Sequence, residues 1–132
     1  MADFPFINKY GKITYSDPAD AFVRSRTYII LKSKTDVLCL YHTEDDLYTL
    51  PTSNDLTVNG QHTNEWTTVS YLTENRHPIK ETQTYFVYSV EKGELPDKSF
   101  QWCKVDDILL NKIAFDCTKL VGIKNLIVRS QE

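Results

Sequence analysis

Short apolar runs separated by polar turn residues recur along this chain, and they predict several β-strands. Residues 22–31 and 37–41 are two runs rich in β-branched, aromatic and aliphatic side chains, and residues 33–36 between them have turn chemistry. Two such runs joined by a short polar loop predict a β-hairpin. Residues 84–90, TYFVYSV, are nearly all aromatic or β-branched, which predicts a strand covered on both faces.

One central segment has a different period. Within residues 62–75 the apolar side chains Trp66, Val69 and Leu72 recur every three positions, as on one face of a helix. The residue before a proline avoids helical geometry, so this helix is expected to end before Pro78.

The remaining segments complete one domain over residues 1–132. The other expected elements are an N-terminal arm or short hairpin (1–20), short strands (48–50 and 100–103), a short helix (105–111) and a final helix (113–128). Mixed strands with one helix in the middle and another at the end predict an α+β or α/β arrangement around one core.

Charge and hydropathy limit the functions to consider. The net charge of the 132 residues is −3 and no stripe of Lys and Arg stands out, which argues against a dedicated nucleic-acid surface. The first residues do not resemble a signal peptide, and no apolar stretch approaches the roughly 20 residues that cross a bilayer. We therefore expect a cytoplasmic protein that makes no use of the membrane.

Glycine and cysteine usage excludes further classes of site. The four glycines form neither G-x-G-x-x-G nor G-x-x-x-x-G-K, so glycine-rich phosphate loops are excluded. The three cysteines are far apart, form no C-x-x-C pair and give no disulfide framework. Cys39 lies in an apolar run, and we expect it to be a buried thiol.

Three local stretches carry a resemblance to a known family: LYTLP at 47–51, ETQTYFVYSV at 81–90 and FQWCKVDDILL at 100–110. Their order and spacing resemble the Nudix (MutT-like) hydrolase family over about residues 22–127. The resemblance implies an α/β fold of the Nudix type, an α/β/α sandwich around a mixed β-sheet. It also implies a function related to the hydrolysis of nucleoside diphosphate derivatives.

The metal site of that family is degenerate in this chain. The family signature, G-x5-E-x7-R-E-U-x-E-E-x-G-U with U an aliphatic residue, places glutamates on one helix face, where their oxygens hold Mg²⁺. In the best register, Tyr71 stands at the first of the three grouped glutamates, Glu74 keeps one, and Asn75 replaces the last. The resemblance thus leaves Glu74 as the candidate catalytic and metal-binding residue, with Mg²⁺ or Mn²⁺ weakly held. Acids of the loops, residues 44–46 and Asp55, could also supply ligands, or could simply be solvated.

Aromatic side chains supply candidates for ligand binding. Tyr48 and Tyr71 are candidates to stack against the base of a nucleotide-like small molecule. Trp66, on the apolar face of the expected helix, is interpreted as a core residue.

Two functional classes follow. The first is a Nudix-fold protein resembling pyrophosphohydrolases, with weak or absent activity. The alternative is a non-catalytic ligand-binding, protein-interaction or regulatory domain on the same scaffold. A true hydrolase that recruits acids from outside the helix, and a homodimer, both stay open at this point.

Overall fold

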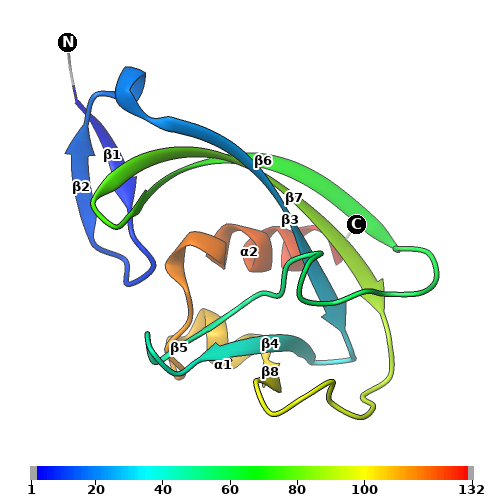
Figure 1. Cartoon of the computed structure of the whole chain (residues 1–132). Helices are drawn as coiled ribbons and strands as arrows, with labels where there is room; N and C mark the ends of the chain where they lie inside the picture. The colour runs from blue at the N-terminus through cyan, green and yellow to red at the C-terminus, as the bar shows by residue number, and fades with distance from the viewer. Residues whose placement is uncertain (1–2, 131–132) are drawn as a thin grey trace.

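The computed structural model describes residues 3–130 and shows a curled mixed β-sheet with α2 held on its concave side (Figure 1). The strands are β1 Phe4–Ile7, β2 Ile13–Ser16, β3 Phe22–Lys32, β4 Asp36–His42, β5 Leu47–Thr49, β6 Asn64–Glu74, β7 His77–Ser89 and β8 Phe100–Lys104. The helices are the 3₁₀ turns η1 Pro18–Asp20 and η2 Cys117–Lys119 and the α-helices α1 Val105–Leu109 and α2 Leu120–Ser130.

The sheet has the strand order β2-β1-β6-β7-β3-β4-β5. Residues 40–42 of β4 pair with β5, and residues 36–40 of β4 pair with β8. Strands β6 and β7 form a long antiparallel hairpin, and β7 runs parallel to the whole of β3. The predicted strand at 84–90 is thus the second half of β7, and β7 has a neighbouring strand on each side. In Figure 1 these three long strands arch over α2, while β4, β5 and β8 lie on its other side.

The predicted hairpin of residues 22–41 is only partly correct. Both strands form, but they pair only where Lys32 meets Val37, after which β4 leaves β3. The free edge of β3 is then met by the chain after β5, through hydrogen bonds from Ile29 N to Pro51 O (2.9 Å) and from Ser53 N to Thr27 O (3.1 Å). This early divergence of β3 and β4 lets the sheet curl around α2.

The helix predicted at 62–75 is wrong, because residues 64–74 form strand β6. The inward-facing side chains of β6 alternate along Trp66, Thr68, Ser70 and Leu72, whereas Val69 is 46% exposed on the outer face. Two of the four inward positions are polar, so the apolar side chains do not show the two-residue alternation of a strand. Their three-residue spacing instead matched the pattern expected of a helix. The many β-branched and aromatic residues of this segment favour a strand. The outer layer that this helix would have supplied to the predicted sandwich has no counterpart at these residues.

The other predicted elements are largely confirmed. The N-terminal segment forms the β1–β2 hairpin, and β5, β8 and α1 lie where the sequence places them. The final helix begins later than predicted, at Leu120. Residues 114–116, before the 3₁₀ turn η2, are extended because they add to the edge of β5, with Tyr48 N donating to Ala114 O (2.8 Å) and Asp116 N donating to Tyr48 O (2.8 Å).

Helix α2 packs very closely on the sheet through Gly122. A Cβ added at this glycine would lie 2.3 Å from Cε1 of Tyr85, so only glycine permits the approach. Ile123 and Leu126 then join the buried core formed by β3, β7 and α1. Cys39 is buried in the same core, as predicted, and is a free thiol. Over residues 3–130, no helix is long and apolar enough to cross a membrane.

Candidate functional site

Buried charge is concentrated where β3 and β7 run side by side. Glu81 of β7 is fully buried, and its Oε2 accepts hydrogen bonds from Nε of Arg24 (2.7 Å) while lying 2.7 Å from Nη2 of the same guanidinium. Its other oxygen accepts a hydrogen bond from the Tyr28 hydroxyl. Burial by itself would raise the pKa of Glu81, but the Tyr28 hydrogen bond and the charges of Lys119 and Arg24 outweigh it and lower that pKa.

A second polar layer lies next to this pair. Gln83 is fully buried, and its amide nitrogen donates to Thr118 O (3.1 Å). Its amide oxygen accepts from the hydroxyls of Tyr85 (2.8 Å) and Ser70 (3.0 Å). This glutamine joins β6, β7 and the chain just before α2, and it fixes the position of Lys119.

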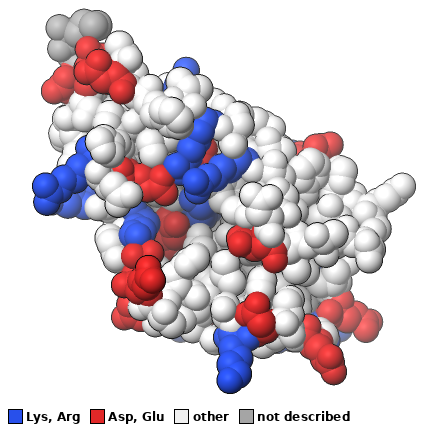
Figure 2. Space-filling view, in the orientation of Figure 1, with Lys and Arg blue, Asp and Glu red and all other residues white. Residues whose placement is uncertain are grey.

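The polar end of the sheet opens into a cleft made of two adjoining cavities of about 480 and 630 Å³. Both cavities are lined by Lys9, Glu74, Asp116 and Lys119. We call their combined space the charged cleft. Figure 2 shows basic and acidic side chains interleaved on this part of the surface, next to the β1–β2 hairpin.

The smaller cavity has an excess of positive charge. Five basic and two acidic side chains line it, and two of the basic ones, Lys9 and Arg24, are paired with Asp45 and Glu81, which are not among its lining residues. These charged residues are Lys9, Lys12, Arg24, Glu74, Arg76, Asp116 and Lys119. Such a local excess attracts anions.

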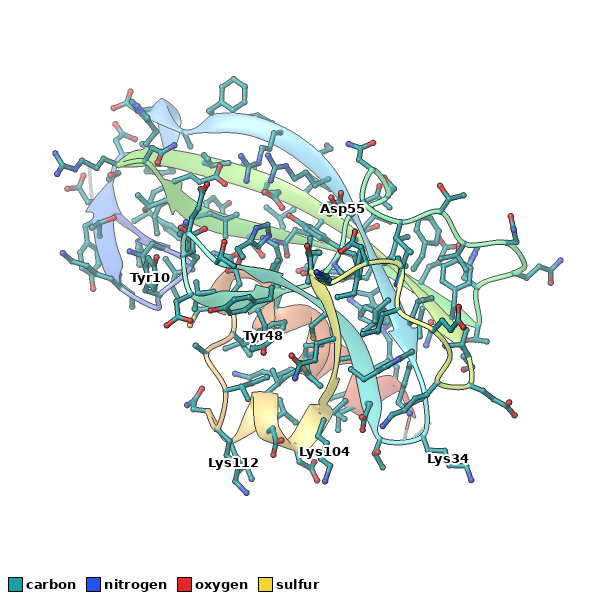
Figure 3. The ribbon with its side chains drawn as sticks, turned by 60° about the horizontal axis from the view of Figure 1, so that its bottom comes forward. Tyr10, Lys34, Tyr48, Asp55, Lys104 and Lys112 are labelled. Carbon is teal, nitrogen blue, oxygen red and sulfur yellow. The ribbon has the colours of Figure 1, made fainter. Side chains whose placement is uncertain are left out.

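The N-terminal hairpin closes one side of the charged cleft. Its tip is attached to the β4–β5 turn by an ion pair between Lys9 Nζ and Asp45 (2.7 Å) and by a hydrogen bond from the Tyr10 hydroxyl to Asp45 O (3.3 Å). Cys117 N also donates to Lys9 O (2.9 Å), which ties the tip to the segment before α2. Figure 3 shows Tyr10 at this hairpin tip and Asp55 on the loop that follows Pro51.

The structure does not bring the three predicted site residues together. Glu74 ends β6 and lines the charged cleft, where it forms an ion pair with Arg24. Tyr48 is on the face of β4, β5 and β8 (Figure 3), with its hydroxyl donating to Gln101 Oε1 (2.8 Å). Tyr71 packs against Phe4 with ring centroids 4.5 Å apart. Neither tyrosine lines the charged cleft, and the functional roles of all three remain predictions.

The acidic groups of the charged cleft do not match a metal site of the family type. Glu74 is paired with Arg24, Asp45 with Lys9, and the carboxylate of Asp116 accepts from Thr118 N (2.9 Å). The residues aligned with the family signature are on a strand instead of a helix, so their carboxylates cannot share one helix face. In the described range 3–130, no three His, Cys, Asp or Glu side chains are grouped closely enough to hold a metal ion. Weak binding of Mg²⁺ or Mn²⁺ therefore remains a prediction.

Several residues of this site escaped the sequence analysis. Arg24 is on the same inner face of β3 as Tyr28 and Ile30, and Glu81 is on the same inner face of β7 as Tyr85. These two charged residues could have been identified from the sequence, because each is an even number of positions from the buried side chains of its strand. Lys119 gave none, because its burial depends on the path of the chain between β5 and α2.

Comparisons with known proteins bear on the fold. No protein-family profile matches the chain, and no curated protein matches it. Among solved structures, the chain is similar to the crystal structure of an Ap4A hydrolase from C. elegans, with 10% sequence identity and a TM-score of 0.52. The similarity covers 84% of this chain and 100% of that one. Because that hydrolase is a Nudix enzyme, the likeness supports a Nudix-like α/β fold for this chain, and at 10% identity it concerns the fold alone.

Proposed function

We propose that this protein is a binding module on a Nudix-like scaffold, which takes a small anionic, nucleotide-like molecule into the charged cleft. The observation that carries the proposal is a pair of basic side chains, Lys12 and Arg76, that line the smaller cavity without a carboxylate partner within residues 3–130. The proposed ligand is a phosphate-bearing molecule because such a molecule can contact several cations at once. Hydrolysis through a helix-borne metal is not part of the proposal, because the segment that would carry the metal ligands is strand β6.

Two basic side chains of the smaller cavity are available to a ligand. Lys12 and Arg76 have no carboxylate within 4.0 Å in the described part of the chain. Arg24, in contrast, is held by Glu74 and Glu81. We therefore assign the first contact with the anion to Lys12 and Arg76, with Arg24 fixing the shape of the wall behind them.

The backbone of Arg76 supports this assignment. Asn75 and Arg76 form the two-residue turn between β6 and β7, and both have positive φ, 50° and 67°. Asparagine tolerates this left-handed conformation well, but arginine seldom adopts it. Residues held in unfavourable backbone conformations cluster at binding sites, which is consistent with a functional role for this side chain.

Calorimetry with the full-length protein tests the proposal. The ligands are ATP, inorganic pyrophosphate and diadenosine tetraphosphate, the last because the structurally similar protein is an Ap4A hydrolase. We expect binding in EDTA that weakens as salt is raised. Lys12→Gln and Arg76→Gln should each weaken binding by about threefold to tenfold. Lys98→Gln, which changes an exposed lysine outside the cleft, is the matched control.

Analysis of the reaction products after incubation with the same ligands and Mg²⁺ or Mn²⁺ separates this proposal from the alternative of a surviving hydrolase. Binding without turnover supports the binding module. Metal-dependent turnover that Glu74→Gln abolishes would instead support a surviving hydrolase. If none of the three ligands binds in EDTA or in metal, the proposal is wrong.

A further inference from the structure

Lys119 is an unusual lysine because it is buried at the floor of the charged cleft. Its side chain is 8% exposed, and it lines both cavities. Its Nζ donates to Thr118 Oγ1 (2.8 Å), whereas Asp116 Oδ2 is 3.8 Å away, beyond hydrogen-bonding distance. Within residues 3–130 the amine thus has one hydrogen-bond acceptor for three possible donors, and it also lies 4.7 Å from the centroid of the Tyr28 ring.

The surroundings of Lys119 lower the pKa of its amine. Burial is the main cause that lowers its pKa, and the charges of Arg26 and Arg24 lower it further. Asp116 and Glu81 oppose this effect without cancelling it. A lysine that is desolvated beside other cations is the kind of amine that acts as a nucleophile.

We propose that Lys119 captures a small aldehyde that carries an anionic group, by forming an imine with it at the floor of the charged cleft. This activity goes beyond the binding role proposed above. Arg26 is placed to receive the anionic group, because it lines the larger cavity with Lys119. In the described ranges Arg26 forms no ion pair of its own.

The step balances without an oxidant or reductant. The lone pair of the neutral amine forms a bond to the carbonyl carbon, and the carbonyl oxygen takes up a proton. The resulting carbinolamine loses water as the C=N bond forms, and the nitrogen gives up its protons in the process. Thr118 is placed to relay these protons, because its hydroxyl accepts from Nζ and itself donates to Asp116 Oδ1.

Reductive trapping on the full-length protein tests this inference. The probe is glyoxylate, an aldehyde with a carboxylate, and cyanoborohydride reduces the imine to a stable amine. Peptide mapping by mass spectrometry then gives the rate of labelling at each lysine. We expect Lys119 to be labelled several times faster than exposed Lys98 and Lys124 near neutral pH, because a lowered pKa raises the neutral fraction of an amine.

Two variants sharpen the result. Lys119→Arg should remove the fast adduct and leave the slow surface adducts. Arg26→Gln should slow labelling of Lys119 by glyoxylate more than labelling by propanal, which is uncharged. Labelling of Lys119 in the unmodified protein no faster than that of Lys98 would overturn the inference, even if the variants fail to fold.

The outcome is distinguishable from that of the proposed function. Binding of ATP or pyrophosphate is measured without an aldehyde and is assigned to Lys12 and Arg76. If the unmodified protein binds nucleotide but shows no fast adduct at Lys119, only the role of Lys119 is overturned. If it shows the fast adduct but binds none of the three nucleotide or pyrophosphate ligands, only the binding module is overturned.

Discussion

The same three strands, β3, β6 and β7, build two different environments along their length. Toward one end, Tyr28, Tyr85 and Trp66 lie side by side in register, with ring centroids 5.4 and 5.6 Å apart in stacked arrangements. Four residues along, Arg24 and Glu81 occupy equivalent inward positions and are joined by charge. One alternating pattern thus supports both a packed core and a charged cleft. The apolar end fixes the three strands in place, and the polar end of the same strands lines the cleft.

Removing Glu81 should give the largest effect, because it breaks the polar end. Glu81→Ala removes the buried carboxylate from Arg24, whose side chain is 16% exposed, and leaves it only the more exposed Glu74; it also leaves the Tyr28 hydroxyl without its acceptor. We expect the free energy of unfolding to fall by about 3–5 kcal/mol, as for other broken buried ion pairs. Urea denaturation measures it. A loss below that of Glu74→Ala, whose carboxylate is 47% exposed, would contradict the proposed importance of burial.

The pH dependence of stability tests the same carboxylate. The folded-state pKa of Glu81 is lower than the ordinary value of 4.5, so the folded state binds protons less readily than the unfolded chain. The stability that Glu81 contributes is therefore fully present above pH 4.5 and is lost as the pH falls below it. The free energy of unfolding of Glu81→Ala, measured by urea denaturation at several pH values below 4.5, should fall less steeply with decreasing pH than that of the unmodified protein.

The packing at the apolar end can be disrupted by a single substitution at Gly122. Gly122→Ala places a methyl group 2.3 Å from Cε1 of Tyr85, so α2 must move away from the sheet. We expect a loss of about 1–3 kcal/mol from overpacking, despite the better helix propensity of alanine. Gly93→Ala, where a Cβ meets nothing within 4 Å, is the control. Equal stability of the two variants would show that α2 does not need its close approach to Tyr85.

The sequence predicts the apolar end of this comparison far better than the polar end. Strand and helix segments such as β8, α1 and the second half of β7 follow from apolar runs and turn residues. Strand β6 does not, because Thr68 and Ser70 occupy inward positions and interrupt the apolar alternation. Polar residues face inward there because they meet Gln83 and the charged cleft, so the site itself hides the pattern.

The charged cleft was still harder to predict. Arg24 and Glu81 are far apart in sequence and meet only through the parallel pairing of β3 and β7. Parallel pairing depends on the whole path of the chain, which local periodicity does not specify. Glu74 was singled out for a helix position, and it does line the cleft, but as the end of a strand paired with Arg24.

Lys119 bears on both ends because its buried amine lies over the Tyr28 ring and also lines the charged cleft. Its pKa in the folded state is lower than the ordinary 10.5, so the unfolded chain holds this proton more tightly. The stability of the protein should therefore rise with pH through the window below 10.5. Lys119→Met should make the free energy of unfolding depend less steeply on pH below 10.5 than it does in the unmodified protein. Equal slopes for the two proteins would contradict a lowered pKa of Lys119.

The smallest effect is expected at the turn that carries the rim of the charged cleft. Arg76 has φ of 67°, and glycine adopts this conformation without the steric cost that a Cβ brings. Arg76→Gly should raise the free energy of unfolding by about 1 kcal/mol while weakening anion binding. Asn75→Gly is the matched control, since it changes the other residue of the same turn, also at positive φ, without removing a cation. It should stabilise less, because asparagine tolerates this region, and it should weaken pyrophosphate binding less than Arg76→Gly does, because Asn75 lines the same cavity but carries no charge. If both variants bind pyrophosphate as tightly as the unmodified protein, Arg76 serves only the turn, and the positive rim must be sought among the other basic residues of the cleft.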